Sequence, residues 1–300
     1  MGTDEVMKPV SPMLVDRRAG KPVWMKFVLV GASAIGLALA GCASTDTNAQ
    51  KLLNPDPPGK MYAAADGALA GGKFENAARK FEDLDRDHPY APEARRAIVM
   101  AAYAYFRAGK FPEAIATARR YTTLHPGTTE AAFAHHIIAS CYFEEMRGPK
   151  FDQSSTQKAL TEYRTLQARY PNSKYARDAE NRIRIAVDSL AAHEMEVGRY
   201  YLKKGNHLAA INRFKTVAKD YQQTAHVEEA LMRLVELYMA LGIKNEAQTA
   251  AAVLGHNFPN SKWYKYAYDL LKSDGLAPRE EQGSWLSSAW KNFKLPKISL

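Results

Sequence analysis

Two short motifs in the chain carry side chains that could act as a nucleophile or a metal ligand. Residues Ser155–Lys158 match the SxxK spacing, in which a lysine activates a serine for attack on an acyl group. They lie at the start of a predicted helix, so we interpret Ser155 as a cap for free backbone N–H groups. His193 and Glu194 begin like the HExxH zinc motif, but Val197 stands where the second histidine belongs.

The remaining histidines and the second cysteine do not form a catalytic or metal-binding cluster either. His135 and His136 are adjacent on a predicted helix, so their side chains diverge by about 100° and we expect one in the core and one in solvent. Cys141 stands in an apolar helical pattern and is predicted to be a core thiol. The sequence contains neither a CxxC pair nor a phosphate-binding glycine loop. It therefore predicts no enzymatic activity, no metal site and no cofactor.

Cys42 follows a segment that directs export. A 14-residue apolar run, Phe27–Ala40, stands behind a basic start and spans roughly 21 Å as a helix, short of the ~30 Å hydrocarbon core. It therefore indicates a secretory signal and not a membrane span. Residues Leu39–Cys42 resemble the lipobox of bacterial lipoproteins, which implies cleavage before Cys42 and acylation of its thiol. The alternative is a chance cysteine after an ordinary signal.

The lipobox divides the first part of the chain into a signal and a tether. We expect residues 1–41 to be the signal peptide, with Met25 as an alternative translation start. Acyl chains contribute about 0.8 kcal/mol per buried CH₂, so the lipid would anchor the mature chain. The lipoprotein resemblance implies that Ala43 and Ser44 direct it to the outer membrane, facing the periplasm. Residues 42–58 lack apolar periodicity and end in prolines, which is typical of a flexible tether.

The net charge of the chain indicates which classes of partner it can bind. Lysine and arginine number 41 against 32 acidic residues, a formal net charge of +9. This balance suits an acidic protein partner or an anionic membrane surface. The basic residues are spread along the chain without interleaved aromatics, so we predict that it does not bind nucleic acid.

Beyond the tether the chain repeats itself. A proline stands twelve residues after each of four alanines, and Gln222 takes the place of proline after a fifth. A glycine five residues before four of the alanines supplies a left-handed turn between two helices, and the proline ends the second helix. These alanines are Ala77, Ala114, Ala159, Ala210 and Ala247. The pattern resembles the tetratricopeptide repeat, so we predict an all-α solenoid of about five helix pairs.

Two repeats depart from this pattern. Residues Arg147–Ser155 form an insert in the third repeat, which we predict to be a loop between its helices. Residues Ser173–Gly205 run without proline and keep helical apolar spacing. A helix of roughly 30 residues would be about 45 Å long, enough to project from the stack or to join two halves of it.

Three segments narrow the resemblance to one family: Thr161–Ile183, Met195–Phe214 and Asn257–Tyr264. Together with the lipobox and the order of repeats over residues 55–264, they resemble the BamD family of lipoproteins in the bacterial β-barrel assembly machinery. The resemblance implies a non-enzymatic scaffold that docks on the periplasmic domains of BamA and helps receive unfolded outer-membrane proteins. Other lipoproteins of the machinery are further candidate partners.

The resemblance also implies where each partner binds. Repeats 1–3, residues 59–171, would form the substrate side, and repeats 4–5, residues 172–272, would dock on BamA. Arg213 matches the family's BamA-contacting arginine, and its planar fork suits a bidentate pair with a carboxylate. The alternative for Arg213 is an ordinary exposed arginine. Tyr200 matches a tyrosine linked to substrate contact, with a packing role as its alternative.

A second implied substrate contact lies in the first repeat, in Asp87–Ala94. There His88 stands where the family has an aromatic residue before proline. We expect Tyr90 to supply the aromatic surface instead.

The tail, residues 273–300, lies outside the resemblance. Trp285, Trp290 and Phe293 fall on one face of a short helix that Ser284 could cap, with lysines after it. Such a helix suits a partner groove or a membrane surface. The alternative is that it folds back on the last repeat.

A second function class also fits a tetratricopeptide lipoprotein. Such a protein could regulate a peptidoglycan synthase or the envelope division machinery. The family motifs favour the barrel-assembly scaffold, and the identity of the bound partner discriminates between the two.

Overall fold

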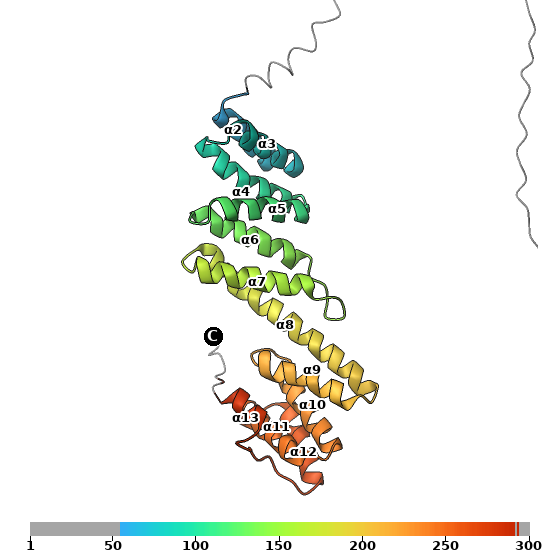
Figure 1. Cartoon of the computed structure of the whole chain (residues 1–300). Helices are drawn as coiled ribbons and strands as arrows, with labels where there is room; N and C mark the ends of the chain where they lie inside the picture. The colour runs from blue at the N-terminus through green and yellow to red at the C-terminus, as the bar shows by residue number, and fades with distance from the viewer. Residues whose placement is uncertain (1–54, 292, 294–300) are drawn as a thin grey trace, which may run out of the picture. The chain divides into compact units, whose positions relative to one another are not determined.

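Helices account for all the regular structure in the part of the chain that the computed structural model describes, residues 55–291 and 293 (Figure 1). Their bounds are α2 Pro58–Ala70, α3 Phe74–Asp87, α4 Pro92–Arg107, α5 Phe111–Leu124, α6 Thr129–Glu144, α7 Ser154–Arg169, α8 Lys174–Lys203, α9 His207–Asp220, α10 Val227–Ala240, α11 Lys244–Asn257, α12 Lys262–Ser273 and α13 Trp285–Trp290. The predicted signal peptide, Cys42 and most of the tether lie outside the described residues.

The first ten of these helices form five pairs. Each helix packs on the next, and the first helices of pairs one to four, α2, α4, α6 and α8, also pack on one another. Figure 1 shows the pairs following one another in chain order, with α13 beside α11 of the fifth pair. This arrangement confirms the predicted all-α solenoid of five helix pairs.

The repeat signature lies at the turns and at the helix contacts. Gly72, Gly109, Gly205 and Gly242 each have φ near +72°, the left-handed conformation that ends the first helix of a pair. The five alanines are fully buried where the second helix crosses the first. The residue before each proline has left the helical conformation, as the proline ring requires.

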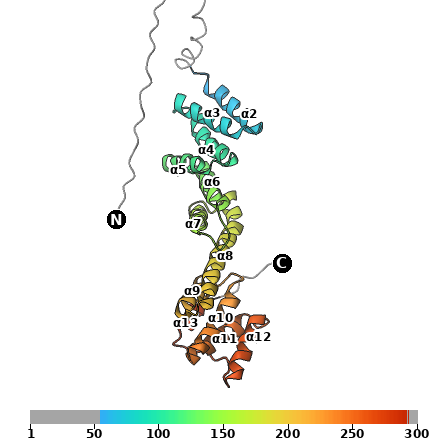
Figure 2. The ribbon, with the colours of Figure 1, turned by 90° about the vertical axis from the view of Figure 1, so that its right-hand side faces the viewer.

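The long helix α8 and the insert of repeat 3 lie against each other. α8 has 30 residues, packs at its start on α6 and α7 of repeat 3, and continues to its partner α9 in repeat 4 (Figure 2). The ring of His193 donates from Nδ1 to the Pro149 carbonyl at 2.7 Å, and Ser189 donates to Gln153 Oε1 at 3.3 Å. The insert is a loop, as predicted, and it braces the middle of α8.

The largest buried cluster lies in repeats 4 and 5, α12 and α13. Phe214 of α9 is fully buried in it. Its ring lies against the backbone of α8 at Gly198, where an added Cβ would come within 2.6 Å of the Phe214 ring. Glycine at this position lets α8 and α9 approach closely enough to hold the ring between them.

Two local expectations were wrong. Ser155 does not cap α7, because the helix begins at Ser154, whose N–H is bonded by Asp152 Oδ1 at 2.9 Å. His136 does not face solvent. The start of α8 covers it, and its ring lies 5.2 Å from the ring of Tyr175. Burial, followed by the charge of Arg182, lowers the pKa of His136 to about 4.

Candidate functional site

Arg213 lies in the middle of α9 with part of its guanidinium free. Nη1 donates to Glu194 Oε2 of α8 at 3.1 Å, with Glu194 Oε1 at 3.5 Å. Nε and Nη2 have no hydrogen-bond partner among the described residues. The Arg213 side chain is 43% exposed. The Nε–Nη2 edge can therefore donate two hydrogen bonds to a carboxylate of another molecule in a bidentate pair.

A network of charged side chains ties α8 to α10. Arg199 donates from Nε and Nη2 to the two oxygens of Glu229, at 3.0 and 2.6 Å. Arg233 adds a third bond to Glu229 at 3.4 Å. Burial raises the pKa of Glu229, but the bonds and charges of Arg199 and then Arg233 outweigh it, and the pKa lies below its usual value. The network joins repeats 4 and 5.

Tyr200 projects from α8 near its end. Its side chain is 58% exposed, with the ring of Tyr201 at 5.6 Å and Lys204 Nζ at 5.9 Å. The exposed ring does not have the packing role that was its alternative. A role in substrate contact stays a prediction. Tyr200 lies in repeat 4, on the same helix pair as Arg213, whereas His88 and Tyr90 lie three repeats away.

The first-repeat residues divide into one structural and one exposed side chain. His88 ends α3, and its Nε2 lies 2.8 Å from the backbone oxygen of Asp56, to which the ring donates. His88 therefore holds the start of the described chain against repeat 1. Tyr90 is 99% exposed in the turn before α4. Of the two, only Tyr90 presents a free aromatic surface.

The tail helix α13 folds back on repeats 4 and 5. Ser284 caps it as predicted. Trp290 is 7% exposed and donates from Nε1 to the Ala218 carbonyl at 2.9 Å, and its ring lies 4.5 Å from that of Phe293. Trp285 donates to Tyr238 Oη at 3.2 Å. The expectation of a membrane- or partner-facing stripe was wrong, because this apolar stripe covers the apolar surface of α9–α11.

Replacing Trp290 by Phe tests this placement. The change removes a buried hydrogen bond to the Ala218 carbonyl and should lower the free energy of unfolding by about 1–2 kcal/mol. Urea unfolding measures the loss. Because the ring is covered, anionic vesicles should leave the tryptophan emission of the unmodified chain unchanged. A blue shift on adding vesicles would contradict the folded-back tail.

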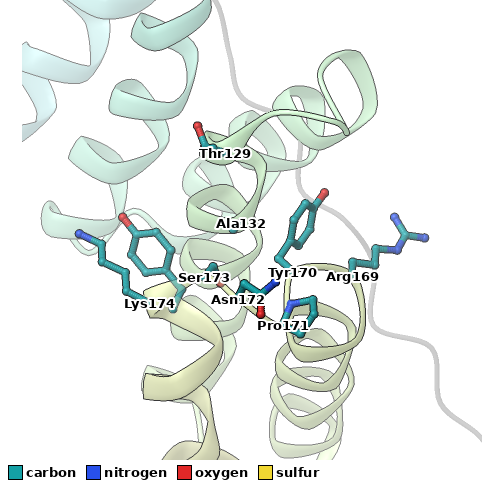
Figure 3. Close-up of a pocket in the computed structure, with 9 residues that line it drawn as sticks. Thr129, Ala132, Arg169, Tyr170, Pro171, Asn172, Ser173 and Lys174 are labelled. Atoms are coloured by element: carbon teal, nitrogen blue, oxygen red, sulfur yellow. The ribbon is translucent and has the colours of Figure 1, made fainter.

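Sequence reasoning missed a pocket at the junction of repeats 3 and 4. A cavity of about 480 Å³ lies between the start of α6, the end of α7 and the start of α8 (Figure 3). Its walls include Thr129, Ala132, Tyr170 and Lys174. Part of its lining comes from Arg169–Tyr175, a stretch inside the family motif Thr161–Ile183. Pro171 marks the end of a helix in the sequence, and the structure shows that Ser173 caps α8. The sequence does not show what packs beside this turn.

The described residues contain no group of three or more His, Cys, Asp or Glu side chains placed to hold a metal ion. In the same part of the chain, no helix is both long and apolar enough to cross a bilayer.

A family model and several curated relatives resemble this chain. The model YfiO, described as "Outer membrane lipoprotein", matches residues 55–254. The "Outer membrane protein assembly factor BamD" of Caulobacter vibrioides is 40% identical over 254 residues, 85% of this chain and 83% of the relative. The proteins of the same name from Rickettsia prowazekii and Neisseria meningitidis serogroup A are 39% and 33% identical, over 80% and 81% of this chain and 94% and 96% of theirs. With a family model over most of the described residues and relatives aligned over most of their length, the chain belongs to the BamD family of outer-membrane protein assembly factors.

Proposed function

We propose that this chain is a non-enzymatic scaffold of the machinery that assembles outer-membrane proteins. Repeats 4–5 dock on the periplasmic domains of BamA, and repeats 1–3 help receive unfolded outer-membrane proteins. Membership of the BamD family supports the role. The observation that carries the docking site is the Nε–Nη2 edge of Arg213, which meets no acceptor in the described part of the chain and lies on a helix pair held by buried contacts. No bond is made or broken, so differential binding is the whole mechanism.

The same proposal includes the anchor. Cys42 carries the lipid after residues 1–41 are removed, and residues 42–58 tether the repeats to the periplasmic face of the outer membrane. The bond from His88 to the Asp56 carbonyl supports a fixed end for that tether at the first repeat.

On the substrate side, Tyr90 is the residue of the first repeat that we propose to contact an unfolded chain. Its ring is 99% exposed, and an exposed tyrosine ring offers apolar area with a polar tip. Tyr200, also exposed, lies on the same helix pair as the proposed docking residue Arg213. We therefore place it where substrate and docking partner would meet.

A photo-crosslink from position 213 in intact cells tests the docking site. The captured protein is identified by mass spectrometry, and a probe at Arg79, an exposed arginine of α3, is the control. We expect capture of BamA from position 213 and not from position 79. Capture of a peptidoglycan enzyme would overturn the function and leave the fold. Capture of neither, or equal capture from both positions, would overturn the docking site.

A further inference from the structure

Glu194 holds Arg213 by one nitrogen only. Both carboxylate oxygens face Nη1, at 3.1 and 3.5 Å, and neither reaches Nε or Nη2. The Glu194 side chain is 18% exposed, less than half the exposure of Arg213. The pair therefore consists of a largely covered carboxylate on α8 and a half-exposed guanidinium on α9, with the binding edge of the arginine unoccupied.

We propose that Glu194 is a positioning residue, which aims the Nε–Nη2 edge of Arg213 at a carboxylate on the docking partner. The inference rests on the proposed role of Arg213 and adds the residue that makes its geometry specific.

The contact between Glu194 and Arg213 favours a positioning role for Glu194, because an exposed arginine side chain is otherwise flexible. Its long side chain loses rotamer freedom when it binds, and a group that is already ordered loses less. α8 supplies a rigid base for Glu194, and the neighbouring turn of α8 packs on Phe214 of α9 at Gly198. Glu194 is itself mostly covered, since its side chain is only 18% exposed.

Glu194 also brings a negative charge that opposes an incoming carboxylate. Two substitutions separate the charge from the positioning. Glu194→Gln keeps an oxygen that accepts from Nη1 and removes the charge. Glu194→Ala removes both. If Glu194 acts by aiming the arginine, the glutamine variant should bind the partner at least as tightly as the unmodified protein, and the alanine variant should bind more weakly.

The matched control is Glu196, two residues further along α8. It pairs with Arg199 Nη1 at 2.8 Å, and no contact joins it to Arg213 among the described residues. Glu196→Gln and Glu196→Ala remove the same groups from the same helix at a distance from the proposed contact. Both should leave partner affinity unchanged.

The experiment titrates the full-length protein with the purified periplasmic domains of BamA from the same organism by calorimetry. We expect Glu194→Ala to weaken binding about three- to tenfold, the effect of ordering one long side chain. NMR relaxation at Arg213 Nε gives a second readout that needs no partner. That group should be ordered in the unmodified protein and in Glu194→Gln, and mobile in Glu194→Ala.

The outcomes separate the inference from the function on which it rests. Arg213→Lys keeps the charge and loses the bidentate edge, so it should weaken binding in every background. If Arg213→Lys has no effect, the docking role of Arg213 fails. If Arg213→Lys weakens binding but Glu194→Ala and Glu194→Gln behave alike, or Arg213 Nε stays ordered in Glu194→Ala, the docking role stands and the positioning role is overturned.

Discussion

Replacing Phe214 by Ala should lower the free energy of unfolding by about 3–5 kcal/mol, the range for deleting a fully buried aromatic ring. The ring has no exposed surface and lies in the largest buried cluster of the described chain. It is held between α9 and the backbone of α8 at Gly198, and two helices cannot easily collapse into the space it leaves. Urea unfolding followed by circular dichroism at 222 nm measures the loss.

Phe151→Ala is the matched control for Phe214→Ala. It removes the same ring from the insert of repeat 3, where the side chain is 57% exposed. Its effect should stay within about 0.5 kcal/mol, as for most surface substitutions. A loss below about 1 kcal/mol for Phe214→Ala would mean that α8 and α9 close the cavity, contrary to the rigid contact described at Gly198.

Replacing Glu229 by Ala should lower the free energy of unfolding by about 3 kcal/mol. The carboxylate is 14% exposed and accepts bonds from Arg199 and Arg233, so its removal leaves two guanidinium groups without their shared partner. Breaking a fully buried ion pair costs about 3–5 kcal/mol. We expect the lower end, because Arg199 and Arg233 keep 37% and 29% of their side chains exposed and water can reach them.

The pH dependence of stability checks that prediction independently. The pKa of Glu229 is lowered in the folded chain, so its stabilising effect is complete above the unfolded pKa of about 4.3. That effect is lost as pH falls through the lower folded value. Unfolding measured between pH 7 and pH 3 should therefore show a larger acid loss for the unmodified protein than for Glu229→Gln. Parallel profiles would contradict a charge-paired Glu229.

The fold could be predicted because the turns between the helices of the repeat depend on the types of a few local residues. A left-handed turn requires Gly109 or its equivalents whatever packs around it, and a proline such as Pro126 ends a helix by its own ring. The small residue at the crossing, as at Ala114, is equally local, since only a short side chain permits close approach. These signals need no knowledge of distant parts of the chain.

What covers an apolar or polar face could not be predicted in the same way. The stripe of Trp290 was visible in the sequence, but whether it met a membrane or α9 depended on residues some 70 positions earlier. The sequence predicted that one of the two adjacent histidines faces solvent, but the start of α8 covers His136. The start of α7 was misplaced by two residues, because Gln153 and not Ser155 is the residue before the helix, and Asp152 accepts from the N–H of Ser154.

The candidate site also contains residues that local motifs predict and residues that only the packing of helices brings together. Arg213 was found because it lies inside a family motif. The sequence shows its partner Glu194 only as part of an incomplete zinc motif and gives no signal for Glu229. Charged pairs between helices depend on how those helices cross and not on residue spacing along one helix. The pocket near Tyr170 was missed for the same reason, since its walls come from three helices.

The continuity of α8 makes the two halves of the repeat array one cooperative unit. Ala179, early in the helix, is buried with repeat 3, and Met195, later in the same helix, is buried with repeats 4 and 5. Unfolding either half would therefore fray hydrogen bonds that the other half needs. A ligand that binds and stabilises repeats 1–3 therefore raises the free energy of unfolding of repeats 4–5 as well, and the reverse holds by the same linkage.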